Sequence, residues 1–158
     1  MPSAVGAPEV TLRSALSSLE RNAVAIDKVS PFYRTLAWPN PADPSFVNAV
    51  ALVSTRHKPL ALLQLLHEIE AEFGRDRAMS TSNAPRTLDL DLIDYEGLIQ
   101  DGPPSLPHPG IASRAFVLVP LCDVAPEWRH PVLGLTVARL IANLGAAADE
   151  PKRLIVAC

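Results

Sequence analysis

The chain has 158 residues and a formal net charge of −3, and 48% of its residues are hydrophobic. This length and composition suit one globular domain with a sizeable core. The modest charge and scattered basic residues exclude a stripe that binds a nucleic-acid backbone, and no apolar run reaches the ~20 residues of a membrane span. With no signal-peptide pattern and no ligand-like cysteine spacing, we expect a single cytoplasmic domain over residues 1–158.

The first half of the chain alternates helical and extended patterns. Apolar residues at helical spacing predict a helix over Glu9–Arg21. Residues 23–33 and 46–53 indicate two strands, the second with apolar residues on both faces. A second helix is predicted to begin at Pro59, a residue suited to the first helical turn, and to end at Gly74, a residue suited to the position after a helix.

The second half of the chain predicts shorter elements. Proline donates no ladder hydrogen bond, so the proline-rich residues 103–109 predict an ordered surface loop. Ser113 is predicted to cap a helix that runs through Leu121, and a last helix is predicted over Thr136–Leu144. Arg153–Ala157 is predicted to form a closing strand.

Two aspartates between these halves give the clearest chemical signal. Asp89 and Asp91 alternate with leucines, so on an extended backbone they share one face, with α-carbons about 6.5 to 7 Å apart. Such carboxylates can bracket two magnesium ions roughly 3.5 to 4 Å apart, as in phosphoryl-transfer sites. The alternative is the solvent-facing side of a half-buried strand, but the mutual repulsion of two carboxylates in a cleft favours the metal site.

Three arginines lie close to this pair in the sequence. Arg86 comes just before the predicted strand and can set a fixed positive charge beside phosphate. Arg75 and Arg77 lie in a polar loop, residues 75–84, whose closure would bring them to a polyphosphate and exclude water. The alternatives are a surface role for Arg86 and a solvated connector for the loop. Because the chain has no Walker-type or kinase glycine loop, side chains and metal must hold phosphate.

Phe46, Asn48 and Phe116 suit a flat heterocyclic acceptor. Two aromatic rings can sandwich such a ring system, and one amide can read its edge. The alternative is that both phenylalanines are ordinary core residues.

Ordered blocks of sequence, from the first helix to Pro126, resemble the 6-hydroxymethyl-7,8-dihydropterin pyrophosphokinase family. The blocks are SPFYRT (30–35), FVN (46–48), PRTLDLD (85–91), LPHP (106–109) and RAF (114–116). The resemblance implies an α+β fold, a ferredoxin-like αβα sandwich with a mainly antiparallel sheet. It also implies transfer of pyrophosphate from ATP, the co-substrate, to the hydroxymethyl group of a reduced pterin, with release of AMP, in folate biosynthesis.

The resemblance implies roles for individual residues. Asp89 and Asp91 would hold two magnesium ions, while Arg75 and Arg86 would steady the triphosphate and the charge that develops during transfer. The implied ATP contacts are His67, Glu70, Arg77, Leu92, His108 and Arg114, of which His67 departs from the residue type expected in the family. The implied pterin contacts are Thr35, Leu36, Trp38, Phe46, Asn48 and Phe116. The implied partners are these two small molecules, and we expect a monomer.

The family begins with an internal apolar strand and a turn, and this chain starts just after that turn. We therefore expect the first strand to be absent, which would leave neighbouring strands with unpaired backbone groups that cost about 1 to 3 kcal/mol each where buried. A start site placed too far downstream would explain this pattern, and a form extended upstream is expected to be more stable. Filling of the gap by Arg153–Ala157 is an alternative.

Two other functions are compatible with these residues. A magnesium-dependent phosphohydrolase could use Asp89 and Asp91 equally well, although the sequence offers no clear base to orient water. A non-catalytic ferredoxin-like nucleotide-binding module would need no turnover, and the absence of the first strand favours it.

Overall fold

The computed structural model describes residues 8–36, 42, 45–74, 88–145 and 152–154. Its elements are α1 (Pro8–Arg21), β1 (Val24–Val29), β2 (Phe32–Thr35), β3 (Phe46–Asn48), β4 (Ala51–Thr55), α2 (Pro59–Glu72), the 3-10 helix η1 (Ile111–Ser113), α3 (Ala115–Val124), α4 (Val137–Leu144) and β5 (Lys152–Leu154). The helices predicted over residues 9–21, 59–74 and 136–144 are therefore confirmed to within two residues at each end. No helix in the described ranges combines the length and the apolar character needed to cross a membrane.

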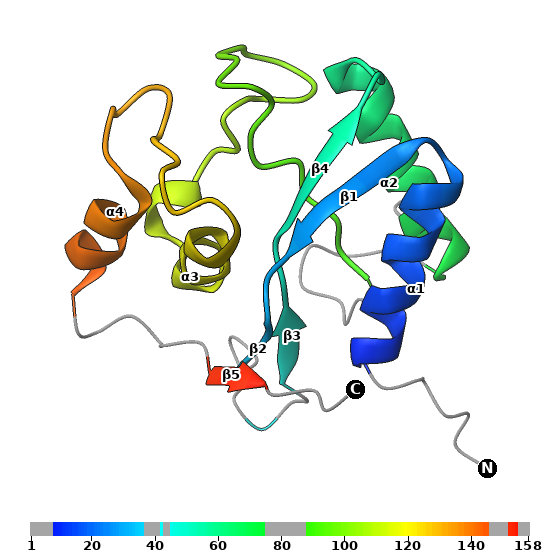
Figure 1. The fold of residues 1–158 in the computed structure, drawn as a ribbon, viewed down its shortest axis with the longest axis horizontal. Helices are drawn as coiled ribbons and strands as arrows, with labels where there is room; N and C mark the ends of the chain where they lie inside the picture. The colour runs from blue at the N-terminus through cyan, green and yellow to red at the C-terminus, as the bar shows by residue number, and fades with distance from the viewer. Residues whose placement is uncertain (1–7, 37–41, 43–44, 75–87, 146–151, 155–158) are drawn as a thin grey trace.

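Two long, bent strands form the centre of the molecule (Figure 1). The first consists of β1 and β2, interrupted at Ser30, and the second consists of β3 and β4. β1 pairs antiparallel with β4, and β2 pairs antiparallel with both β3 and β5. At the bend, the Ser30 hydroxyl accepts a hydrogen bond from the Val50 amide at 3.0 Å, and the Ser30 amide donates to the Val50 carbonyl at 2.9 Å. These bonds join the two bent strands where the ladder is interrupted.

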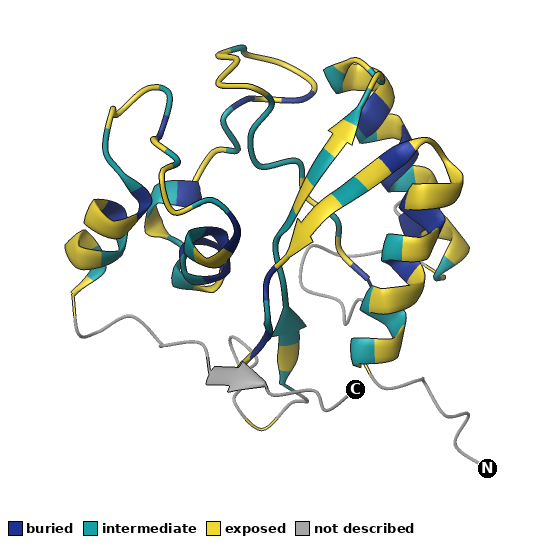
Figure 2. Cartoon of the chain, in the orientation of Figure 1, coloured by how far each residue is buried: buried dark blue, intermediate teal, exposed yellow. Residues whose placement is uncertain are grey.

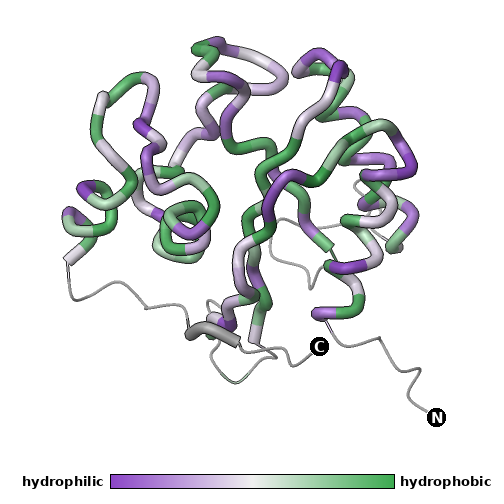
Figure 3. Tube along the Cα trace, viewed as in Figure 1, coloured by the Kyte–Doolittle hydropathy of each residue, from purple (hydrophilic) through white to green (hydrophobic). Residues whose placement is uncertain are grey.

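Helices cover both faces of these strands (Figure 1). α1 and α2 pack on one face around a core cluster that includes Leu19, Leu66 and Ile69. α3 and α4 pack on the other face around a second cluster that includes Leu118 and Val137. Figure 2 shows the buried helix residues on the inward sides, and Figure 3 shows hydrophobic residues along the central strands and in α3. This layered α+β arrangement confirms the fold class expected from the sequence.

Local sequence explains where the helices begin and end. Pro59 occupies the first turn of α2, where its missing N–H would have no helical partner. Gly74 follows that helix with a φ of +86°, a backbone conformation that glycine adopts without strain. Thr136 caps α4, because its hydroxyl oxygen accepts a hydrogen bond from the Arg139 amide at 3.2 Å.

Two predicted boundaries need correction. Ser113 does not cap α3, because the chain turns at Gly110 into η1 and the Ser113 hydroxyl donates back to the Gly110 carbonyl at 3.0 Å. Arg114 is therefore the residue that precedes α3. The closing strand β5 begins at Lys152, and residues 155–157 of the predicted strand lie outside the described residues. Among the described residues, Lys152–Leu154 pair with β2, and the part of the predicted strand that the structure does not describe stays a prediction.

The predicted aspartate strand keeps its alternation but forms no ladder. Leu88 is buried and Leu90 is half-buried, whereas Asp89 and Asp91 are exposed. Among the strands that the structure describes, none pairs with residues 88–94, and β4 pairs only with β1. The prediction of a strand over this segment is therefore wrong, and a cavity is lined by both this segment and β4.

A buried histidine holds the turn that leads into α4. His130 is 8% exposed, and its Nδ1 accepts hydrogen bonds from the amides of Val132 and Leu133, each at 3.2 Å. Burial lowers the pKa of His130 below its ordinary value of about 6.5, and the negative charge of Asp94 opposes this shift. A protonated Nδ1 could no longer accept the two amide hydrogens.

The depressed pKa of His130 makes stability depend on pH. Below about pH 6.5 the unfolded chain takes up a proton that the folded chain resists, so the contribution of His130 is complete above that pH and is lost as pH falls through the folded pKa. We expect the melting temperature of the unchanged protein to fall more between pH 7.5 and 5 than that of His130→Asn, whose amide oxygen can accept the same bonds. Parallel curves of melting temperature against pH would refute this role.

Candidate active site

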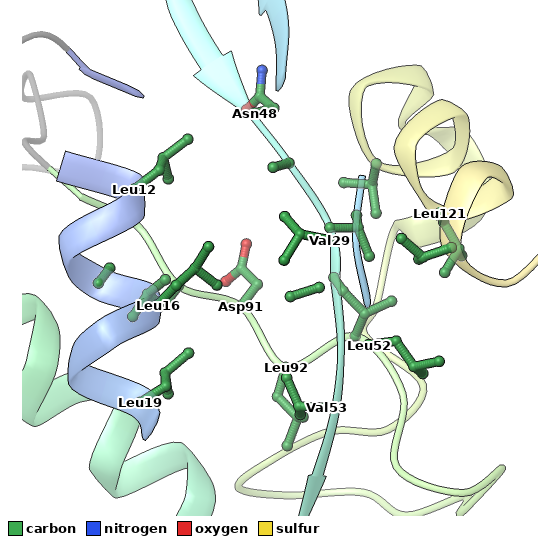
Figure 4. Close-up of a pocket in the computed structure, with 18 of the residues that line it drawn as sticks. Leu12, Leu16, Leu19, Val29, Asn48, Leu52, Val53, Asp91, Leu92 and Leu121 are labelled. Carbon is green, nitrogen blue, oxygen red and sulfur yellow. The ribbon is translucent and has the colours of Figure 1, made fainter. Parts of the chain in front are cut away.

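A cavity of about 320 Å³ brings together residues from distant parts of the chain. Its walls include α1, β4, residues 89–94 and α3 (Figure 4). Most of the lining is aliphatic, and its polar side chains include Asn48, Asp89, Asp91 and Asp94. A mostly apolar cavity with a few convergent polar groups is typical of sites for small molecules.

The two predicted metal ligands lie on this cavity. The backbone of residues 88–92 alternates, so Asp89 and Asp91 both face away from the buried Leu88. Figure 4 shows Asp91 between α1 and the central strands. The side chain of Asp91 is 46% exposed, and its Oδ1 lies 3.8 Å from Nε2 of His108.

The donor set of the aspartate pair fits magnesium. Among the residues that the structure describes, no three or more histidine, cysteine or acidic side chains converge in a ready-made metal cage. Mg²⁺ is ordinarily bound by only one or two carboxylates, with water and substrate phosphates completing its octahedron. Two accessible carboxylates at the edge of an open cavity match that pattern, because they leave positions for phosphate oxygens.

His108 connects the proline-rich loop to the aspartate segment. Its backbone amide donates to the Ile93 carbonyl at 2.8 Å, which holds the imidazole beside Asp91. Nδ1 is buried and has no hydrogen-bond partner among the described residues. The loop itself is ordered as predicted, because Gln100 and Leu106 exchange two backbone hydrogen bonds of 3.0 Å each.

Two phenylalanines are too exposed to be core residues. Phe46 is 46% exposed on β3, and Phe116 is 40% exposed at the start of α3. The guanidinium of Arg114 lies 5.9 Å from the centre of the Phe116 ring, and this cation–π contact orients both side chains. The alternative of ordinary core residues is therefore wrong, although which ligand these rings contact stays a prediction.

Asn48 has a fixed orientation at the edge of the cavity. Its Nδ2 donates to the Thr35 hydroxyl oxygen at 2.9 Å, across the β2–β3 pair. The side chain of Thr35 therefore orients the amide. Leu36 follows β2 and is 57% exposed, and Trp38 lies outside the described residues.

Only some of the remaining predicted nucleotide-binding residues line the cavity. Leu92 lies on the cavity wall and His67 is half-buried on α2. Glu70 is fully buried, and its Oε1 accepts a hydrogen bond from the Leu90 amide at 2.7 Å. The contact between Glu70 and ATP stays a prediction. The arginines predicted to hold phosphate, Arg75, Arg77 and Arg86, lie outside the described residues.

Comparison of the sequence with known proteins identifies a matching family model and several similar proteins. A family model described as 7,8-dihydro-6-hydroxymethylpterin-pyrophosphokinase matches residues 1–126. A Synechocystis protein named 2-amino-4-hydroxy-6-hydroxymethyldihydropteridine pyrophosphokinase is 37% identical over 142 residues, which cover 89% of this chain and 71% of the relative. A protein of the same name from Pseudomonas aeruginosa is 42% identical over 128 residues, which cover 78% and 76% of the two chains. The folic acid synthesis protein FOL1 of Dictyostelium discoideum is 43% identical over 101 residues, 63% of this chain but 15% of that longer protein.

Proposed function

This chain belongs to the 7,8-dihydro-6-hydroxymethylpterin-pyrophosphokinase family, and we propose that it transfers pyrophosphate from ATP to the hydroxymethyl group of 6-hydroxymethyl-7,8-dihydropterin in folate biosynthesis. The structural observation that best supports this function is a cavity lined both by Asp89 and Asp91 and by Asn48 and Phe116. Side chains suited to a metal-bound phosphate and side chains suited to an aromatic ring therefore line the same cavity. Transfer of a group between two small molecules requires both to bind side by side.

Asp89 and Asp91 are proposed to hold two Mg²⁺ ions. When bound, such ions would neutralise the charge that develops on the phosphate oxygens. The accessibility of Asp91 supports this assignment, as does its position on the cavity wall. His108 and Arg114 would add donors to the nucleotide phosphates, and the imidazole of His108 already lies beside Asp91.

Phe116 and Asn48 are proposed to hold the pterin, with Phe46 on its other face. The amide of Asn48, oriented by Thr35, would read the edge of the ring. The pterin hydroxyl oxygen would then attack the β-phosphorus of ATP. The bond from that phosphorus to the oxygen bridging to the α-phosphorus breaks, AMP leaves, and the hydroxyl proton passes to water. No protein nucleophile is required, since positioning and charge stabilisation supply most of the catalysis in phosphoryl transfer.

Arg75 and Arg86 are proposed as the catalytic cations of this transfer, and Arg77, Leu92 and His67 as further nucleotide contacts. These assignments rest on the family resemblance and on the need for positive charge beside a polyphosphate. Leu36 and Trp38 would close the pterin pocket. We also propose a single domain that acts as a monomer, for which light scattering would give a mass near 17.0 kDa.

One assay separates this function from its alternatives. The protein is incubated with ATP and magnesium, with and without the reduced pterin, and the nucleotides are resolved by chromatography. AMP that forms only in the presence of pterin is the expected result. Phosphate release without pterin would instead indicate a phosphohydrolase, and no turnover in either reaction would indicate a binding module.

A further inference from the structure

A buried carboxyl group on α2 contacts the backbone between the two metal-binding aspartates. Glu70 has an exposed fraction of 0%, and its Oε1 accepts a hydrogen bond of 2.7 Å from the amide of Leu90. Leu90 separates Asp89 from Asp91 in the sequence. The bond therefore holds the Asp89–Leu90 peptide, one of the two peptide groups that join the aspartates.

This contact replaces the support that a neighbouring strand would give. Among the described strands none pairs with residues 88–94, so ladder hydrogen bonds do not fix the rotation of this segment about its axis. The backbone hydrogen bonds of this segment include the one from the Leu90 amide to Glu70 and the one that the Ile93 carbonyl accepts from the amide of His108. In an extended chain the N–H lies at right angles to the side chains, so the direction of one amide sets the direction of the flanking carboxylates.

The acceptor itself is rigidly held. Glu70 follows Ile69, which is 0% exposed, and Leu66 on the previous turn of α2 is 7% exposed. Leu88, at the start of the aspartate segment, packs in the same core cluster and is 3% exposed. Groups that orient metal ligands act best when their own side chains are fixed by packing.

We propose that Glu70 is a positioning residue, which sets the orientation of Asp89 and Asp91 for metal binding by holding the Leu90 amide. The role rests on the proposed function, because it concerns the same carboxylate pair.

The test compares two substitutions that differ in the acceptor they retain. Glu70→Gln keeps a carbonyl oxygen at the position of Oε1, whereas Glu70→Leu has similar bulk and no acceptor. Glu72→Leu is the matched control, because Glu72 lies on the same helix, is exposed, and accepts its hydrogen bond from the Ser18 hydroxyl instead. Two readouts are used: exchange of the Leu90 amide hydrogen by NMR, and loss of the free Mn²⁺ signal by electron paramagnetic resonance in the presence of α,β-methylene-ATP.

Glu70→Leu is expected to speed exchange of the Leu90 amide and to weaken Mn²⁺ binding by ~10- to 100-fold, the usual effect of losing a group that orients a metal ligand. Glu70→Gln is expected to stay within about threefold of the unchanged protein, and Glu72→Leu to match it, because both keep the Leu90 contact. In turnover, high metal concentration is expected to restore much of the kcat of Glu70→Leu, since the chemical groups remain present.

Unchanged Leu90 exchange or unchanged Mn²⁺ affinity in Glu70→Leu would overturn the positioning role, even if its melting temperature fell. Should that variant fail to fold, Glu70→Asp replaces it, because the shorter arm cannot reach Leu90 without displacing the segment; Mn²⁺ affinity equal to that of the unchanged protein would then overturn the role. Failure of the unchanged protein to bind Mn²⁺ with nucleotide would count against the proposed function instead. Exchange of the Leu90 amide hydrogen reports on the hydrogen bond to Glu70 even when no Mn²⁺ binds, so the two failures can be distinguished.

Discussion

Replacing Asp91 with alanine is expected to lower kcat by ~10³-fold or more while the protein stays folded. Metal-bridged charge stabilisation contributes several kcal/mol to phosphoryl transfer, and each 1.36 kcal/mol corresponds to about a tenfold change in rate. The side chain of Asp91 is 46% exposed, so the fold does not depend on its packing. The measurement is steady-state turnover with ATP, magnesium and the reduced pterin.

The control for this prediction is Asp101→Ala, which removes an exposed carboxylate from a loop away from the cavity lining. Its turnover is expected to match that of the unchanged protein. Urea unfolding of all three proteins is expected to agree within about 0.5 kcal/mol, as is usual for surface substitutions. Turnover retained in Asp91→Ala would contradict the metal assignment, and a large loss of stability in that variant would show that Asp91 is structural.

The second large effect is expected from Asn48→Ala. Removal of the amide would lower kcat/KM for the pterin by about 10²-fold, because two hydrogen bonds to the ring edge would be lost at about 0.5 to 1.5 kcal/mol each and the ring would be less well oriented. The KM for ATP is expected to change little, since the predicted nucleotide contacts lie on other elements. The two KM values, measured separately, distinguish pterin recognition from a general loss of activity.

Thr35→Val provides the companion variant. The hydroxyl of Thr35 accepts the hydrogen bond from Nδ2 of Asn48 at 2.9 Å, so its removal frees the amide to rotate without deleting it. A smaller fall in kcat/KM for the pterin, of roughly tenfold, is therefore expected. An Asn48→Ala protein with unchanged pterin kinetics, or one with ATP kinetics equally impaired, would contradict the assignment of Asn48 to the pterin edge.

Periodicity predicted the helices well because their sequences are locally consistent. α2 is an example: proline at its start, leucines at helical spacing and Gly74 after its end all point to the same element. The same reasoning failed at Ser113, where a capping residue type was present but the left-handed turn at Gly110 led into η1 instead. That outcome depends on the path of the backbone, which residue types alone do not specify.

The aspartate segment shows a second limit of sequence reasoning. Alternation of leucine and aspartate correctly predicted which side chains share a face, since this follows from the geometry of any extended chain. Whether the segment pairs with another strand depends on its neighbours in space. For residues 88–94 no described strand supplies that pairing, and a helix carboxyl group holds the backbone instead.

Glu70 left a signal in the sequence that points to its burial. Leu62, Leu66 and Glu70 succeed one another at four-residue intervals, so Glu70 lies on the apolar stripe of α2. A carboxyl group on such a stripe requires a hydrogen-bond partner. The partner, an amide 20 residues away, could not be identified without the structure. Likewise, the exposure of Phe46 and Phe116, which separates ligand-directed rings from core rings, is a property of the folded surface.

The most direct test of the account is a crystal structure of this chain soaked with α,β-methylene-ATP and magnesium. We expect Mg²⁺ with carboxylate oxygens of both Asp89 and Asp91 at about 2.0 to 2.1 Å and with phosphate oxygens completing the coordination. Ions bound at other residues, or aspartate side chains that point apart in the presence of nucleotide, would contradict it.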